Sequence, residues 1–330
     1  MYDVITFGGA TRDIFVKTGS GLIFPNPEDE KEKIMAFNYG QKIISDDAHF
    51  SFGGGAFNTA VSFRKMGLET GICINVGVDE SAHSIIKKLQ ENGIDTSLIT
   101  VDDNNHTALS IIIMDRKDHI AILHRGANNY LSISNPEKIK NAKWFYISSL
   151  TGQSAEILPE LIKIASENNI KVAINPGSKQ LNSDHSKLCS ILDKVELVIL
   201  NREEAEELVC NEESCEIIED NKVLLHKVQK LGPKRVIMTE GAKGSYYADS
   251  KIVHFEHAFK KDRPTVDTTG AGDAFGSTFV ACIIKGMDVP MAQKAAAMNA
   301  SEITQCVGAQ ECLLTYKQIE DKLKKIKVVN

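Results

Sequence analysis

Short β-rich runs alternate with helical stretches along most of this chain, and this alternation constrains the fold more than any other feature of the sequence. The β-rich runs lie at about residues 4–7, 70–76, 144–147, 171–175, 195–200, 235–239, 244–248 and 252–255. Helices are predicted at about residues 58–66, 81–92, 155–168 and 291–305, and from residue 202 onward. Strands that alternate with helices form βαβ units, in which helices cover both faces of a parallel sheet. We therefore expect a single doubly wound α/β domain over residues 1–330.

Two segments, at about residues 11–51 and 107–128, interrupt this alternation. The first contains short strand-like pieces, and the second alternates apolar and polar residues over 109–114 and again over 120–123, as a β-hairpin does. We expect the two segments to form a small separate β-sheet over one edge of the main domain. Such a sheet is either a lid that excludes water from a reacting group or a surface hairpin without a functional role.

The bulk composition is that of a folded protein rather than a nucleic-acid or membrane binder. Hydrophobic residues make up 42% and charged residues 25% of the chain, and the net charge is −6, whereas nucleic-acid and membrane-surface binding need a basic patch. The seven cysteines are scattered without a Cys-x-x-Cys pair, so we expect reduced thiols and no zinc site. The N-terminus lacks signal-peptide features and no apolar run is long enough to span a membrane, which predicts a cytoplasmic location.

The segment that carries the strongest chemical signal runs from Val266 to Phe275. Gly270, Ala271 and Gly272 open a predicted helix there, and Asp273 follows directly. Small residues let a ligand approach the backbone, and the free N–H groups of a helix's first turn attract phosphate oxygens. A carboxylate in that same turn can accept a proton from an attacking hydroxyl. This pattern indicates a phosphoryl-transfer site.

A second glycine-rich segment lies near the N-terminus, where Gly53, Gly54 and Gly55 precede a helix whose first turn holds Asn58. A backbone without side chains and an Asn amide suit a ligand rich in hydroxyl groups. The spacing is not Gly-x-Gly-x-x-Gly, which argues against a dinucleotide-binding fold. Asp13 follows the first strand, at the sheet edge where ligands of open α/β folds bind, and an acid there can hold sugar hydroxyls.

Two further segments suit a nucleotide with its metal. Glu204, at a strand-to-helix junction with Asn201, can help to hold a hydrated Mg²⁺ that bridges nucleotide phosphates. The segment 239–245 offers spaced glycines and a lysine that can cover those phosphates. No Gly-x-x-x-x-Gly-Lys-Ser/Thr stretch occurs, so the chain is not a P-loop enzyme.

Each of these motifs also has a structural reading. Asp267 or Thr269 can cap an ordinary helix, Asn201 and Glu204 match a capping box, and Asp13 suits a turn.

Taken together and in this order, the motifs resemble those of the ribokinase-like, or PfkB, family of carbohydrate kinases, from Asp3 to about Thr315. The family's fold is a central, mostly parallel sheet flanked by helices, with a small β-sheet lid. The resemblance implies that Asp273 deprotonates a sugar hydroxyl, which attacks the γ-phosphorus of ATP. It also implies that Gly270, Ala271 and Gly272 form an anion hole for the phosphoryl oxygens.

The resemblance assigns the remaining site residues to three groups. The sugar contacts are Asp13, Gly54, Gly55 and Asn58. The residues for nucleotide, phosphate and Mg²⁺ are Asn201, Glu204, Thr239, Gly241 and Gly244. Many members bind a monovalent cation beside the anion hole, and the corresponding positions are Asp267, Thr269, Cys306, Gly308 and Cys312. We therefore expect activation by K⁺.

The sequence departs from ribokinases at two sugar-binding positions. Gly55 replaces a usual lysine, and Ser148 to Leu150 stand where ribokinases place a sugar-binding glutamate, which argues against ribose. Arg125, at the end of the predicted lid, either meets an acidic or phosphorylated substrate or is simply solvated. A ketose, an aldopentose, a sugar acid and a nucleoside all remain open.

Two alternatives compete with a sugar kinase. One is a nucleoside kinase of the same fold, with a base slot formed by aromatic lid residues such as Phe37, Tyr39 and Phe50. The other is a catalytically silent sugar-binding sensor that kept the fold. Family members often pair through their lids, so we also expect a homodimer.

Overall fold

The computed structural model describes residues 1–27, 33–115, 118–210, 218–260 and 263–329, and an eight-stranded sheet forms its centre. In spatial order its strands are β16 (Val253–His257), β15 (Gly244–Ala248), β14 (Val236–Thr239), β13 (Leu197–Asn201), β12 (Lys171–Ile174), β11 (Ala142–Ile147), β1 (Tyr2–Phe7) and β6 (Thr70–Cys73). The pairs from β6 to β14 are parallel, and β15 and β16 are antiparallel additions at one edge. The mostly parallel central sheet is thereby confirmed.

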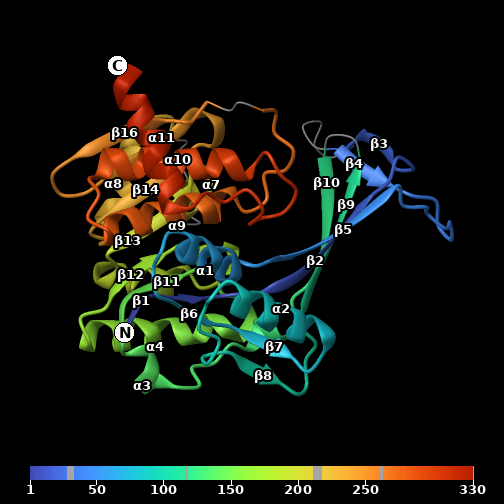
Figure 1. Cartoon of the computed structure of the whole chain (residues 1–330), viewed down its shortest axis with the longest axis horizontal. Helices are drawn as coiled ribbons and strands as arrows, with labels where there is room; N and C mark the ends of the chain where they lie inside the picture. Colours follow the sequence, from blue (N-terminus) through green and yellow to red (C-terminus); the bar gives the residue numbers. More distant parts are fainter. Residues whose placement is uncertain (28–32, 116–117, 211–217, 261–262, 330) are drawn as a thin grey trace.

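Successive side chains of each central strand enter different cores, because both faces of the sheet are covered. Ile5 and Phe7 pack with the helices of one face, which are α4 (Leu158–Glu167), α7 (Arg202–Val209) and α8 (Asn221–Lys230). Val4 packs with those of the other face, which are α1 (Gly55–Lys65), α9 (Ala271–Ile284), α10 (Val289–Ile303) and α11 (Tyr316–Val329). Figure 1 shows the order of the central strands, from β16 near the top to β6 near the bottom. The predicted alternation is correct because a strand buried on both faces must be continuously apolar.

The run predicted as one strand over 70–76 is split between two sheets. Only β6 joins the central sheet, while β7 (Asn75–Gly77) pairs with β8 (Thr100–Asp102), beside helix α2 (Glu80–Glu91). The remaining α-helices of the described residues are short and comprise α3 (Pro136–Ile139), α5 (Ser178–Leu181) and α6 (His185–Cys189).

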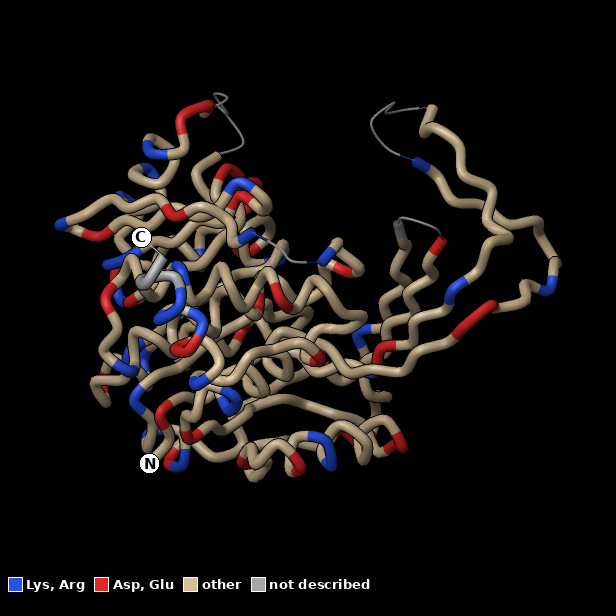
Figure 2. Tube along the Cα trace, turned by 45° about the horizontal axis from the view of Figure 1, so that its top comes forward, with Lys and Arg blue, Asp and Glu red and all other residues tan. Residues whose placement is uncertain are grey.

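A separate four-stranded sheet projects from the main body, as Figure 2 shows. Its strands are, in order, β10 (Asp118–His124), β9 (Ala108–Asp115), β2 (Thr11–Lys17) and β5 (Asp47–Gly53). A small hairpin of β3 (Leu22–Pro25) and β4 (Lys33–Ala36) accompanies it. Asp13 is in register with Ser51 on one side and Ser110 on the other, so these three residues share a face. Among the described helices, none is both long and apolar enough to cross a bilayer.

Candidate active site

Gly270 turns the chain sharply into α9. Its φ of 77° lies in the left-handed region, and a Cβ there would stand 2.5 Å from the Cβ of Ala309. Glycine is therefore required both by the conformation and by the approach of the loop that holds Ala309. Two residues later, a Cβ built on Gly272 would meet no atom within 4 Å. At Gly272 the first turn of α9 thus faces open space, as an anion site needs, while the Ala271 N–H donates to the Thr268 carbonyl at 3.2 Å.

Asp273 lies in this first turn and is connected to the other glycine-rich segment. Its Oδ2 accepts a hydrogen bond of 2.8 Å from Nδ2 of Asn58 in α1. A Cβ built on Gly55 would stand 3.7 Å from Asp273 Oδ1 and 2.7 Å from the Ser148 hydroxyl, so the missing side chain leaves space in front of Oδ1.

Burial raises the pKa of Asp273 to about 6, and the hydrogen bond from Asn58 opposes this rise. A carboxyl group with a pKa near neutrality and one uncovered oxygen suits a general base.

Asn58 is engaged by the protein at both ends of its amide. It is 5% exposed, and its Oδ1 accepts a hydrogen bond from Nε2 of Gln310, which also donates to the Phe52 carbonyl at 2.7 Å. Sequence reasoning missed Gln310, although it directly follows Gly308 and Ala309, at the end of the predicted helix 291–305. Among the predicted sugar contacts, Asn58 therefore connects Asp273 directly to Gln310.

Asp13 carries a buried oxygen without a hydrogen-bond partner in the described part of the chain. The residue is 5% exposed and its Oδ1 makes no hydrogen bond. Burial raises the pKa of Asp13, while the hydroxyls of Ser110 and Thr11 oppose the rise. An unsatisfied buried oxygen is costly, so this one suits a ligand hydroxyl. Gly54 has a structural reason to be glycine, because a Cβ there would stand 2.4 Å from the Gly9 carbonyl.

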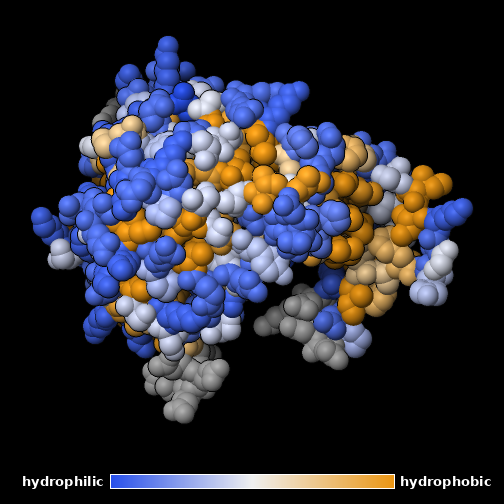
Figure 3. All heavy atoms as spheres, turned by 90° about the horizontal axis from the view of Figure 1, so that it is seen from below, coloured by the Kyte–Doolittle hydropathy of each residue, from blue (hydrophilic) through white to orange (hydrophobic). Residues whose placement is uncertain are grey.

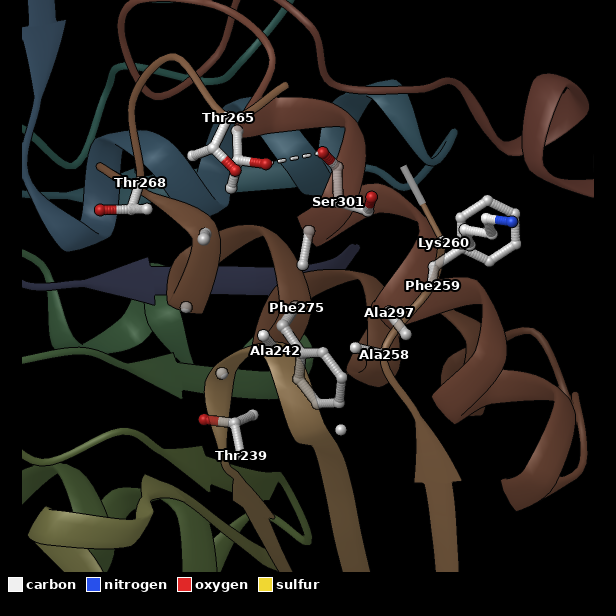
Figure 4. Close-up of a pocket in the computed structure, with 16 residues that line it drawn as sticks. Thr239, Ala242, Ala258, Phe259, Lys260, Thr265, Thr268, Phe275, Ala297 and Ser301 are labelled. Atoms are coloured by element: carbon white, nitrogen blue, oxygen red, sulfur yellow. Dashed lines mark hydrogen bonds between the residues drawn. The ribbon is translucent and has the colours of Figure 1, made fainter. Parts of the chain in front are cut away.

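A cavity of about 760 Å³ opens beside α9. Its lining includes three of the predicted nucleotide residues, Thr239, Gly241 and Gly244, together with Ala271 and Gly272. Figure 4 shows Phe275, Ala297 and Ala258 around the same hollow.

Helix α10 supplies lining residues that the sequence did not predict as part of a site, namely Ala297, Ala300 and Ser301. Its small residues were predicted only to pack closely, and Ala295 and Ala296 do so at 0% exposure. Alanines of this one helix therefore serve two purposes, since some pack in the core and others line the cavity.

Asn201 and Glu204 form the capping box that one reading predicted. Asn201 Oδ1 accepts from the Glu204 N–H, and Glu204 Oε2 accepts from the Asn201 N–H, both at 2.8 Å. Burial raises the pKa of Glu204, the hydrogen bond from the Asn201 N–H opposes this rise, and the charges of Glu207, Glu203 and Asp273 add to it. Burial likewise raises the pKa of Tyr146 well above its usual value, and the charges of Asp273 and Glu204 contribute. The Tyr146 hydroxyl is buried without a partner among the described residues.

Three of the five residues predicted for a monovalent cation meet at Asp267, which is 8% exposed. Its Oδ1 accepts from the N–H and hydroxyl of Thr269, at 2.9 and 2.7 Å, and its Oδ2 accepts from the Gly308 N–H at 3.1 Å.

The remaining two, Cys306 and Cys312, form a disulfide, which corrects the expectation that all cysteines are reduced. Their Cα atoms lie 6.1 Å apart within one loop, a distance that disulfides span, and the absence of a Cys-x-x-Cys pair does not exclude such a bond. Cys210 is disulfide-bonded as well.

Arg125 is exposed just beyond β10, and its carbonyl accepts from the Asn128 N–H at 3.0 Å. Within the described ranges, no recorded contact joins Arg125 to Asp13, Asn58 or Asp273. The structure does not bring this predicted residue together with the others.

Comparisons with known proteins agree with this geometry. A family described as "pfkB family carbohydrate kinase" matches residues 16–316. A ribokinase from Staphylococcus aureus is 28% identical over 76% of this chain and 80% of its own length. A nucleoside kinase from Methanocaldococcus jannaschii is 28% identical over 84% of this chain and 87% of its own length. The structure of Arabidopsis thaliana ribokinase complexed with ribose and ATP superposes with a TM-score of 0.80 at 21% identity, covering 98% and 99% of the two chains.

Proposed function

Because the chain belongs to the pfkB family of carbohydrate kinases, we propose that it transfers the γ-phosphoryl group of ATP to a hydroxymethyl group of a small sugar or sugar derivative. At family level it is an ATP-dependent kinase of sugars or nucleosides. The observation that carries the finer proposal is the placement of Asp273. Its Oδ1 faces the space left by Gly55, at the N-terminus of a helix that opens on the large cavity.

In this proposal Asp273 accepts the proton of the substrate hydroxyl, whose oxygen attacks the γ-phosphorus. The new O–P bond forms as the bond from the γ-phosphorus to the ADP oxygen breaks. The N–H groups of Gly270, Ala271 and Gly272 stabilise the charge on the phosphoryl oxygens. Asp13, with its unpartnered Oδ1, Gly54, Gly55 and Asn58 hold the sugar.

The nucleotide occupies the cavity lined by Thr239, Gly241 and Gly244. Asn201 and Glu204 would hold Mg²⁺ through water, and the metal would neutralise charge between the phosphates. The Tyr146 hydroxyl is buried without a partner among the described residues, and the charges of Asp273 and Glu204 act on it, which supports a polar ligand at this place. Because the phosphoryl donor is a nucleotide, we propose that the reaction takes place in the cytoplasm. The whole chain forms one domain in this proposal, and its projecting sheet acts as a lid over the site.

The test is ADP release from ATP and Mg²⁺ across pentoses, hexoses, ketoses, sugar acids and nucleosides. A sugar that stimulates release identifies the acceptor class. Preferential stimulation by nucleosides would instead support the nucleoside-kinase alternative, which the similarity to the Methanocaldococcus jannaschii protein favours. Ligand binding without any ADP release would support the silent sensor.

We predict that K⁺ raises the rate severalfold. Asp267 is a nearly buried carboxylate that receives three hydrogen bonds, and no ion pair is recorded for it within the described residues. A monovalent cation held by Asp267, Thr269, Gly308 and the carbonyls at Cys306 and Cys312 would balance its charge and order the Gly270 turn. The measurement compares rates in KCl and in tetramethylammonium chloride at equal ionic strength; equal rates would contradict it.

We also propose that two copies pair through the projecting sheet. Its edge strands β5 and β10 are unpaired on their outer sides within the described chain, and its apolar side chains include Phe50 and Ile122, at 57% and 56% exposure. Figure 3 shows apolar surface gathered over this part of the molecule.

Replacing Ile122 by glutamate should therefore shift the protein from dimer to monomer in sedimentation velocity. Ile252→Glu is the matched control, because Ile252 is 43% exposed outside this sheet. A monomeric wild type, or a dimer that is unchanged by Ile122→Glu, would refute the pairing.

A further inference from the structure

Two side-chain amides connect the Phe52 carbonyl to the carboxylate of Asp273, and only one of them was predicted as part of the site. We propose that Gln310 is a positioning residue for phosphoryl transfer, which fixes the amide of Asn58 so that its N–H₂ group, rather than its oxygen, faces Asp273. This inference rests on the proposed function, in which Asp273 is the base.

The direction of the hydrogen bonds is set at both ends by groups that can only accept. The Phe52 carbonyl at one end accepts from Gln310 Nε2 at 2.7 Å, and the ionised Asp273 at the other end accepts from Asn58 Nδ2 at 2.8 Å. Between them, Gln310 Nε2 also donates to Asn58 Oδ1. Because a backbone carbonyl cannot reverse its role, it selects the orientation of Gln310, and Gln310 selects that of Asn58.

Solvent cannot easily replace this arrangement. Gln310 is 6% exposed and Asn58 is 5% exposed. The Gln310 backbone is also held by α1, the helix that carries Asn58, because Lys65 Nζ donates to the carbonyls of Gln310 and Leu313, each at 3.2 Å. The loop after α10 and the helix α1 therefore hold each other in place at the side-chain and backbone levels.

Without Gln310, only Asp273 itself would favour the present orientation of the Asn58 amide. If the amide rotated, its oxygen would face Asp273 Oδ2, and two acceptors would repel each other. The hydrogen bond from Asn58 lowers the pKa of Asp273 against the effect of burial, so its loss would raise that pKa further. The other titratable groups close to Asp273 are Tyr146 in β11 and Glu204 in α7, and no recorded contact within the described residues joins either to Gln310.

The experiment compares pH profiles of kcat/KM for the acceptor, identified by the panel above, in wild type, Gln310→Met and Gln310→Glu. Met has a similar volume and no N–H donor, so the Asn58 amide would no longer be held toward Asp273. Because Asp273 would then lose a hydrogen bond to its charged form, we expect the acid limb of the kcat/KM profile to move up by about one pH unit. We expect a larger shift for Gln310→Glu, because a carboxylate would attract the Asn58 N–H₂ away from Asp273. KM for ATP should change less than twofold in both.

Gln293→Met is the control, because Gln293 is a fully buried glutamine in α10 that bonds to Ser245, away from Asp273. It should destabilise the fold without moving the acid limb. Unshifted acid limbs in folded Gln310→Met and Gln310→Glu would overturn the proposal, as would equal shifts in Gln293→Met. If the proposed function itself were wrong, the result would differ, because Asp273→Asn would keep its activity regardless of the results for the Gln310 variants.

Discussion

Replacing Asp273 by asparagine should lower the kinase rate about a thousandfold and make the folded protein more stable at pH 8. The loss follows because an amide cannot accept the proton of the substrate hydroxyl, and a positioned general base contributes roughly 10²–10⁴ in rate. The gain follows because the native pKa of Asp273 is raised from 3.8 to about 6, so its ionised form is disfavoured in the fold. A rise of this size corresponds to about 1–3 kcal/mol in the free energy of unfolding at pH 8.

The pH dependence of that gain is a separate check. Below pH 3.8 the carboxyl is protonated in both folded and unfolded states, so Asp273→Asn should be as stable as wild type there. The advantage of the variant should grow as the pH rises from 3.8 to 6 and stay constant above. Urea unfolding at pH 4 and pH 8, with the exposed Asp321→Asn in α11 as a matched control, measures this difference. If wild type and Asp273→Asn were equally stable at both pH 4 and pH 8, the fold would not disfavour the ionised form of Asp273.

The second large effect is expected from adding one methyl group at Gly272. This position has no neighbour within 4 Å of a built Cβ, and it lines the cavity, so Gly272→Ala should fold at least as well as wild type. Alanine also favours a helix by up to about 1 kcal/mol over glycine. The methyl group would nevertheless occupy the approach of the phosphoryl oxygens, and we expect kcat to fall by about a hundredfold, as for the loss of one oxyanion-hole donor.

The same change two residues earlier should behave differently. Gly270→Ala places a methyl group 2.5 Å from the Cβ of Ala309 at a φ of 77°, so both stability and activity should fall. Thermal unfolding together with kcat and KM for ATP separates the two variants. Full activity in Gly272→Ala would mean that the phosphate does not approach this helix.

The sequence predicts local features of this molecule well. The central strands are confirmed because their residues are apolar on both faces, and the predicted start of α9 is correct, since Gly270 has the left-handed conformation that lets the chain turn into the helix. The split of residues 70–76 between two sheets was missed, since continuous hydrophobicity does not report which partner each half pairs with.

The hydrogen bonds that connect the residues of the candidate site could not be predicted from local spacing in the sequence. Asn58 and Asp273 are 215 residues apart in sequence, and Asn58 and Gln310 are 252 apart. A glutamine after a helix looks like any polar loop residue until the fold brings Phe52 and Asn58 against it. The disulfide between Cys306 and Cys312 was missed for a related reason, because only the course of the loop shows that its ends meet.

The short distance along the chain between the projecting sheet and the helix that carries Asn58 has a mechanical consequence. Strand β5 ends at Gly53 and α1 begins at Gly55, so Gly54 alone separates the sheet from the helix that carries Asn58. The backbone of Gly54 lies so close to the Gly9 carbonyl that a Cβ would stand 2.4 Å from it, and Gly9 just precedes β2 of the same sheet. If the projecting sheet moves over an arriving substrate, as proposed above, its movement would be transmitted through these two glycines to α1 and to Asn58, the neighbour of Asp273.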